Sequence, residues 1–146
     1  MSLDADMAFL ALTIALLKKT KKKRTRRWSK QWYLLRDRFT HEHLQKILQV
    51  TEPNDFNNFL RMDNEAFETL LEMVRPNIEK QDSNMRQAIP ASQRLSVTLR
   101  FLATGMDLED LKFTCAIAPY TLEGIIMETC EAIIEKLKEN IAVSRN

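Results

Sequence analysis

The residues best suited to chemistry are three neighbouring acids, Asp107, Glu109 and Asp110, and two cysteines, Cys115 and Cys130. Two-metal phosphoryl transfer needs carboxylates from separate elements, gathered around ions ~3.5–4 Å apart. These three acids instead fall together at the expected start of one helix. There they predict an N-terminal cap and a complement to the helix dipole. The sequence therefore predicts no catalytic residue and no enzyme activity.

The cysteines and histidines also lack the spacing of a metal site. Cys115 and Cys130 both adjoin apolar residues, which favours reduced thiols in the core of an intracellular protein. His41 and His43 are remote from them in sequence, so no four-ligand zinc set can be assembled. We expect no metal, no cofactor and no small-molecule substrate.

Charge is distributed very unevenly along the chain. Residues 18–38 hold eleven Lys and Arg and one acid, a net charge of +10, whereas residues 39–146 carry a net charge of −6. A basic run of this kind is suited to binding DNA phosphates or to serving as a nuclear import signal. The residues assigned to this nucleic-acid or import arm are Lys18, Lys19, Lys21, Lys22, Lys23, Arg24, Arg26, Arg27 and Lys30.

Aromatic residues follow the basic run. Trp28 and Trp32 are four residues apart and would share one helical face. They could stack on nucleic acid, but anchoring of the arm to the protein core is the favoured interpretation.

A short apolar helix is expected before the arm. Its seam alternates spacings of four and three, which is typical of a heptad repeat. Two heptads are too few for a stable isolated coiled coil, so we expect the helix to pack against a partner, a second copy or the protein's own domain. Residues 7–17 are too few to span a bilayer, and no membrane association is expected. The seam of this association helix consists of Leu3, Met7, Leu10, Ile14 and Leu17.

The elements that follow predict an all-α fold. Two Gly, four Pro and the absence of period-2 stretches favour helices, and the apolar spacing predicts a bundle of about six or seven. Residues 1–38 form the apolar helix and basic arm, and residues 39–146 form the helical domain. The expected helix caps are Thr40, Thr51 or Asn54, Asp63 and Ser92, with Pro76 as a kink or restart.

The domain is expected to end in a helix-turn-helix-like unit over residues 92–140. An apolar helix closes at Gly105, a residue that enters the left-handed conformation without steric penalty. A short helix carries Leu108, Leu111 and Phe113. A break at residues 117–119 precedes a long helix that starts near Thr121. This order is typical of a helix-turn-helix.

Several strings in this region resemble a known family. They are MRQAIPASQRLSVTLRFLATG (residues 85–105), NFLRM (58–62), KQDSNMR (80–86) and ETCEAI (128–133). The chain resembles, over roughly residues 26–137, the N-terminal region of PIF/Harbinger transposases and Harbinger-derived nucleases. The resemblance implies a helix-turn-helix before a nuclease domain with an Asp-Asp-Glu triad, which this chain lacks. It also implies a separate Myb/SANT-like DNA-binding partner.

The chain departs from the family where DNA would be read. The family sequence runs close to I-G-R-S-T-V-S-R-I-V, and residues 117–126 here keep its apolar positions but lose its arginines. Acids in a groove oppose binding to phosphates. The degenerate reading-helix residues are Tyr120, Thr121, Glu123 and Gly124.

Together these features favour a nuclear, non-catalytic protein-interaction module whose partner is Myb/SANT-like. A homodimer is the other protein association left open. The alternative functions are a DNA-binding module that uses the basic arm, and a truncated fragment of a metal-dependent Harbinger-type nuclease.

Overall fold

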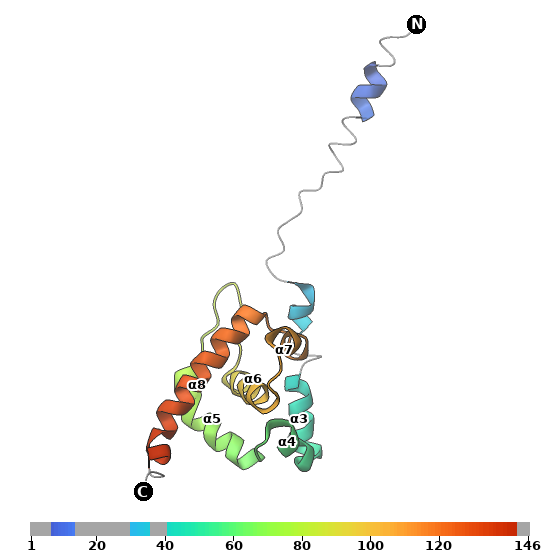
Figure 1. The fold of residues 1–146 in the computed structure, drawn as a ribbon. Helices are drawn as coiled ribbons and strands as arrows, with labels where there is room; N and C mark the ends of the chain where they lie inside the picture. Colours follow the sequence, from blue (N-terminus) through green and yellow to red (C-terminus); the bar gives the residue numbers. More distant parts are fainter. Residues whose placement is uncertain (1–6, 14–29, 36–40, 143–146) are drawn as a thin grey trace. The chain divides into compact units, whose positions relative to one another are not determined.

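The computed structural model describes residues 7–13, 30–35 and 41–142 (Figure 1). Two compact units are distinguished, Met1–Lys30 and Gln31–Asn146. The boundary expected from the sequence lay at residue 38, so the structure assigns residues 31–35 to the second unit.

In the first unit, residues 7–13 are helical. Met7 and Leu10, two members of the predicted association seam, are exposed at 66% and 58%. Phe9 and Leu12 are exposed as well. The remaining seam residues, Leu3, Ile14 and Leu17, lie outside the described residues.

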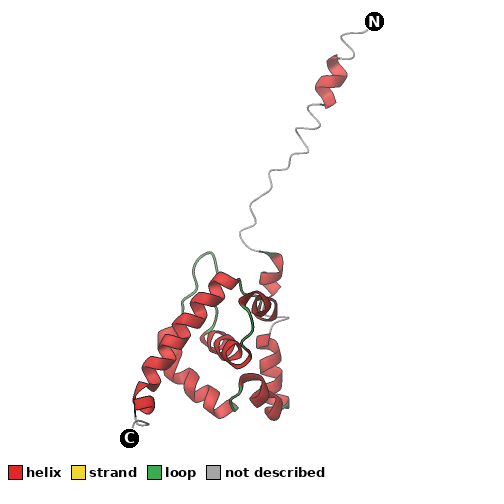
Figure 2. Ribbon diagram, in the orientation of Figure 1, coloured by secondary structure: helices red, strands yellow, loops and turns green. Residues whose placement is uncertain are grey.

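Every regular element in the described part of the second unit is a helix, and loops join the helices (Figure 2). The prediction of an all-α bundle is confirmed. A lone bridge between Ser83 and Arg86 lies in the connection that precedes α6. The elements are the 3-10 helix η1 (Gln31–Leu35) and the α-helices α3 (His41–Thr51), α4 (Pro53–Leu60), α5 (Asn64–Ile78), α6 (Ala91–Thr104), α7 (Leu108–Cys115) and α8 (Pro119–Ala142).

Two of the predicted helix boundaries are confirmed in atomic detail. The Asp63 carboxylate accepts a 2.7 Å hydrogen bond from the Ala66 N–H at the start of α5. Gly105 takes the left-handed conformation (φ 62°) after α6, and its N–H donates to the Phe101 carbonyl. Both satisfy backbone groups that a helix end leaves unpaired.

Other predicted boundaries are wrong. Helix α4 begins at Pro53 after Glu52, not after a Thr51 or Asn54 cap. Helix α6 begins at Ala91 after Pro90, so Ser92 lies inside it. Proline has no N–H to satisfy and its φ suits the first helical turn, so Pro53 starts its helix without a side-chain cap.

The predictions for Pro76 and Thr40 have different outcomes. Pro76 lies inside α5, which continues to Ile78, so the predicted restart does not occur. Thr40 lies outside the described residues.

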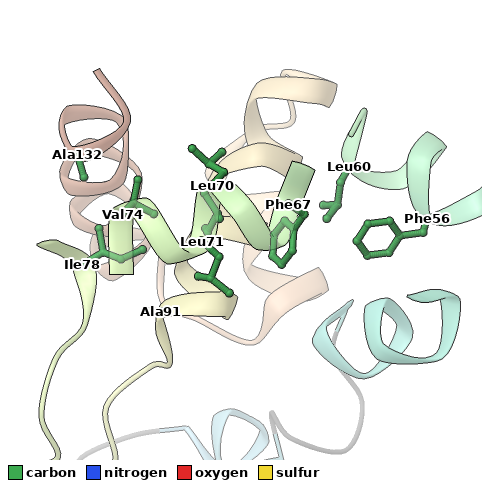
Figure 3. Close-up of a cluster of buried hydrophobic side chains, with 10 residues drawn as sticks. Phe56, Leu60, Phe67, Leu70, Leu71, Val74, Ile78, Ala91 and Ala132 are labelled. Carbon is green, nitrogen blue, oxygen red and sulfur yellow. The ribbon is translucent and has the colours of Figure 1, made fainter. Parts of the chain in front are cut away.

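Two clusters of buried side chains hold the bundle together. The first joins α4, α5, α6 and α8, and in it Phe56 meets Phe67 edge to face with ring centroids 6.1 Å apart (Figure 3). The second lies between α6, α7 and α8 and contains Val97, Leu111 and Ile125. Helix α8 contributes to both clusters, so its inward side is fixed by the whole bundle.

Candidate interaction face on the last helix

Helices α7 and α8 are joined by a three-residue turn, within the segment where the sequence predicts a helix-turn-helix-like unit. Ala116 ends α7 in the left-handed conformation (φ 52°), and its N–H donates to the Lys112 carbonyl at 2.9 Å. Ile117 is buried in the turn, and α8 starts at Pro119 rather than near Thr121. Leu122 is fully buried one turn later. The apolar positions of this segment therefore provide its packing, as expected.

The outward side of α8 carries large apolar side chains. Tyr120, Met127 and Ile134 are exposed at 88%, 58% and 60% and follow one another at seven-residue spacing. Seven residues are almost two full helical turns, so the three side chains form one row. Gly124 and Glu131 adjoin this row on the same side and are also exposed. We call these five residues the α8 face.

The α8 face includes two of the four predicted reading-helix residues, Tyr120 and Gly124. The other two, Thr121 and Glu123, are exposed beside it. Met127 and Ile134 were not among the functional residues predicted from the sequence. Their spacing was the available signal, but apolar residues at helical spacing more often predict a buried side.

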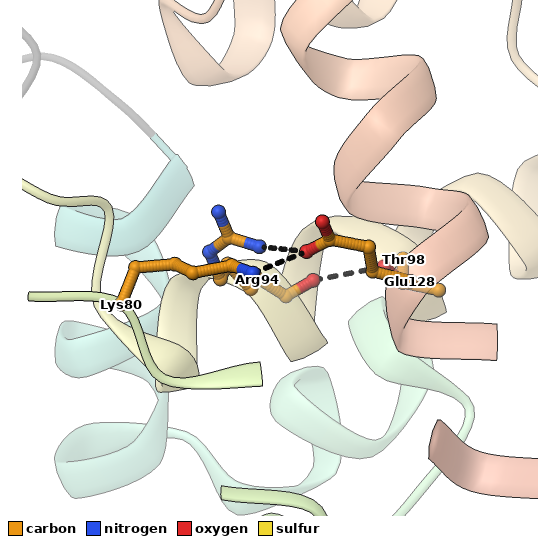
Figure 4. Close-up of polar contacts among 4 residues, drawn as sticks. All are labelled: Lys80, Arg94, Thr98 and Glu128. Atoms are coloured by element: carbon orange, nitrogen blue, oxygen red, sulfur yellow. Dashed lines mark hydrogen bonds and ion pairs between the residues drawn. The ribbon is translucent and has the colours of Figure 1, made fainter. Parts of the chain in front are cut away.

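The part of α8 that carries this face is acidic. Residues 119–135 contain four glutamates and no Lys or Arg. Glu128 forms ion pairs within the chain, since its carboxylate lies 2.9 Å from Arg94 Nη1 and 3.4 Å from Lys80 Nζ (Figure 4). Glu135 accepts a 3.0 Å hydrogen bond from the Asn77 amide.

The other two glutamates are free to meet a partner. Glu123 and Glu131 have no ion-pair or hydrogen-bond partner among the described residues. Both are exposed next to the apolar row.

Gly124 has no internal reason to be glycine. A Cβ built at this position would have no atom within 4 Å beyond its local chain, and its φ lies outside the left-handed region. Glycine inside a helix costs about 1 kcal/mol relative to alanine. The glycine therefore lowers the stability of the helix and leaves a position without a side chain between Tyr120 and Met127.

One predicted arm residue, Lys30, is described and is exposed. The other arm residues and Trp28 lie outside the described residues. Trp32 in η1 stacks on Phe113 of α7, with ring centroids 5.8 Å apart and planes 14° apart. This contact supports anchoring to the domain as the role of Trp32.

The three neighbouring acids, Asp107, Glu109 and Asp110, lie at the start of α7. Asp107 occupies the N-cap position, but its side chain makes no capping hydrogen bond. Lys112 Nζ donates to the Glu109 carboxylate, and this hydrogen bond raises the pKa of the lysine. Among the described residues, no group of three or more His, Cys, Asp or Glu could hold a metal ion.

Neither cysteine forms a disulfide in the described structure. Cys115 is fully buried, and its Sγ donates to the Leu111 carbonyl at 3.0 Å. Cys130 is partly buried on α8, and this burial raises the pKa of its thiol.

A cavity of about 260 Å³ lies beside α3 and the start of α6. Gln93 lines it and is only 1% exposed, yet neither its amide nitrogen nor its amide oxygen has a hydrogen-bond partner. No feature of the sequence predicted this cavity. Its lining residues are Glu42, His43, Lys46, Gln87, Ala88, Pro90 and Gln93.

No family model matches the chain, and searches of curated proteins and of solved structures return no match. In the described part of the chain, no helix is both long enough and apolar enough to cross a bilayer.

Proposed function

We propose that this protein is a non-enzymatic nuclear interaction module that binds a protein partner through the α8 face. One observation carries the proposal. The outward side of the helix that would read DNA holds Tyr120, Met127 and Ile134 together with exposed glutamates, and it has no cation before Lys136.

DNA binding by this helix is opposed by its charge. Proteins gain affinity for DNA by placing Lys and Arg against phosphates, whereas Glu123 and Glu131 would meet phosphates with like charge. An exposed row of large apolar side chains instead suits a protein surface. Tyr and Met are enriched in the centres of such interfaces.

The resemblance to Harbinger-type transposases supports the nuclear location and the class of partner. In that family, the helix-turn-helix protein works with a separate Myb/SANT-like DNA-binding protein. We extend that arrangement to this chain by analogy, because fold alone does not define function.

The test is affinity capture from nuclear extract with the full chain. We expect a Myb/SANT-like protein to be recovered, and recovery to be lost in Met127→Asp. The matched control is Val50→Asp, which places the same charge at an 83% exposed residue of α3. Circular dichroism should show unchanged helix content in both variants.

Equal recovery of the same proteins by both variants would contradict the proposal. Tight binding of a defined DNA duplex that Met127→Asp abolishes would contradict it as well.

The second candidate is DNA binding by the basic arm, favoured by the net charge of +10 in residues 18–38. Deletion of residues 1–30 should then abolish DNA binding, whereas Thr121→Ala should leave it unchanged. Affinity should also fall steeply with salt. Electrophoretic mobility shifts at two salt concentrations would measure the DNA affinity of each variant. DNA binding retained by the deletion variant would show that the arm is not the DNA-binding segment.

A further inference from the structure

We infer that the partner segment that covers the α8 face is a basic amphipathic helix. This inference rests on the proposed function and adds the chemistry of the partner. Three features of the described residues lead to it: the seven-residue spacing of the apolar row, the open position at Gly124, and the two unpaired glutamates.

The apolar spacing specifies the shape of the occupant. Tyr120, Met127 and Ile134 occupy one heptad position. The second position, three residues further along, holds Glu123 in the first repeat and then Cys130 and Leu137. Cys130 and Leu137 are partly buried at the edge of the two core clusters. Two such rows form the seam into which a second helix packs at a small crossing angle. A partner helix lying along α8 would bury the large exposed side chains of the first row.

Gly124 allows close approach at the N-terminal half of this seam. With no Cβ and no neighbouring atom above it, the position leaves room for a large side chain of the partner between Tyr120 and Met127. Small residues at helix contacts permit this kind of approach in general. The stability that glycine costs the isolated helix would be offset by the contact it permits.

The charges specify the sign of the partner. Glu123 and Glu131 flank the apolar row without internal partners, whereas Glu128 and Glu135 are already engaged by Arg94, Lys80 and Asn77. Lys or Arg beside the apolar positions of the partner helix would complement the two free carboxylates. Charge complementarity of this kind selects partners and excludes others.

A second copy of α8 is a poor occupant for the same reason. It would bring the same glutamates against Glu123 and Glu131, and like charges placed together across an interface are costly. The partner helix is therefore assigned to a different, basic segment.

The experiment uses the full chain and two fluorescent 21-residue peptides. Both carry Leu at the two apolar heptad positions, and one has Lys and the other Glu at all flanking positions. We expect fluorescence anisotropy to show saturable binding of the Lys peptide that Met127→Asp abolishes. Binding of the Glu peptide to the basic arm should not respond to Met127→Asp, and the arm's repulsion of the Lys peptide cancels between variants because the arm is present in all of them.

Two variants locate the binding site. Glu123→Gln combined with Glu131→Gln should weaken Lys-peptide binding about fivefold or more, since each exposed ion pair contributes up to roughly 1 kcal/mol. Gly124→Gln should weaken binding by blocking approach without lowering the melting temperature. The charge-matched control, Glu52→Gln just before α4 combined with Asp55→Asn in α4, should bind as the unaltered chain does.

An equal effect of Met127→Asp on the binding of the two peptides would overturn the inference, as would Lys-peptide binding that is insensitive to both test variants. A dimer seen by sedimentation and dispersed by Met127→Asp would make a second copy the occupant and would also overturn it. In either case, capture of a protein partner that still depends on Met127 would leave the proposed function standing. If neither capture nor peptide binding responds to Met127→Asp, both fail.

Discussion

Replacement of Gly124 by alanine should stabilise the protein. The residue lies inside α8, a Cβ there would meet no atom within 4 Å, and its φ lies outside the left-handed region. Alanine therefore removes the conformational freedom of glycine without introducing strain. The expected gain is about 1 kcal/mol in the free energy of unfolding. For a chain of this size, that corresponds to a rise of about 3 °C in the melting temperature.

The same substitution at Gly105 is the matched control, because these are the only two glycines in the sequence. Gly105 has φ +62° at the end of α6, where an alanine Cβ is strained by roughly 1–2 kcal/mol. Gly105→Ala should therefore lower the melting temperature while Gly124→Ala raises it. Thermal and urea unfolding of both variants, followed by circular dichroism, would measure the difference.

A loss of stability in Gly124→Ala would contradict the expected gain. It would mean that the glycine already packs closely against something in the folded protein in solution. Stabilisation accompanied by weaker partner binding would instead show that Gly124 is retained for the interface.

Three further predictions concern the interior and its edges. Glu128→Ala should lower the free energy of unfolding by about 1–2 kcal/mol, because it leaves the Arg94 side chain, which is only 11% exposed, without its carboxylate partner. Lys80→Ala should lower it by less than about 1 kcal/mol, and urea unfolding of both variants measures the difference. Gln93→Met should raise the free energy of unfolding by about 1 kcal/mol because it removes two unpaired amide atoms, and a loss would show that the amide has a partner in solution. Burial raises the pKa of the Cys130 thiol, so as the pH rises the unfolded chain loses the thiol proton before the folded chain does, and the free energy of unfolding falls. In thermal melts, Cys130→Ala should therefore lose less stability than the unaltered chain between about pH 8 and pH 10.

The sequence predicted the order and type of the helices because their apolar positions repeat with helical period and their ends carry distinctive residues. Asp63 can accept a backbone hydrogen bond, and Gly105 can take a left-handed conformation, so each specifies a boundary by itself. Pro53 and Pro90 also determine helix starts, but through backbone restriction. Polar residues nearby, such as Ser92, therefore predicted caps that the structure does not use.

The outward side of α8 was harder to predict, because apolar residues surround most of this helix. Leu122, Ile125 and Met127 all look like core residues, yet only the first two are buried. Thr129, a polar residue, is also fully buried. The spacing of apolar residues along α8 shows that the helix has apolar stripes, but the packing of α5, α6 and α7 against it determines which stripe is buried.

The buried and exposed sides of α8 are separable, so exposed residues of this helix can be replaced without disturbing the core. Leu122, Ile125 and Ile126 hold the helix to the bundle, whereas Glu123 and Gly124 are exposed and make no core contact. Glu123→Ser combined with Gly124→Arg installs the residues that Harbinger-type transposases carry at these positions. The fold should survive, because only exposed atoms change.

DNA binding measured across a salt series should then show both a higher affinity and a steeper dependence on salt. One added phosphate contact steepens the slope of log affinity against log salt by roughly 0.9. Unchanged DNA affinity in a folded double variant would contradict this view, since it would mean that α8 cannot reach a duplex whatever its charge. The absence of cations from the α8 face would then not be what separates this helix from DNA.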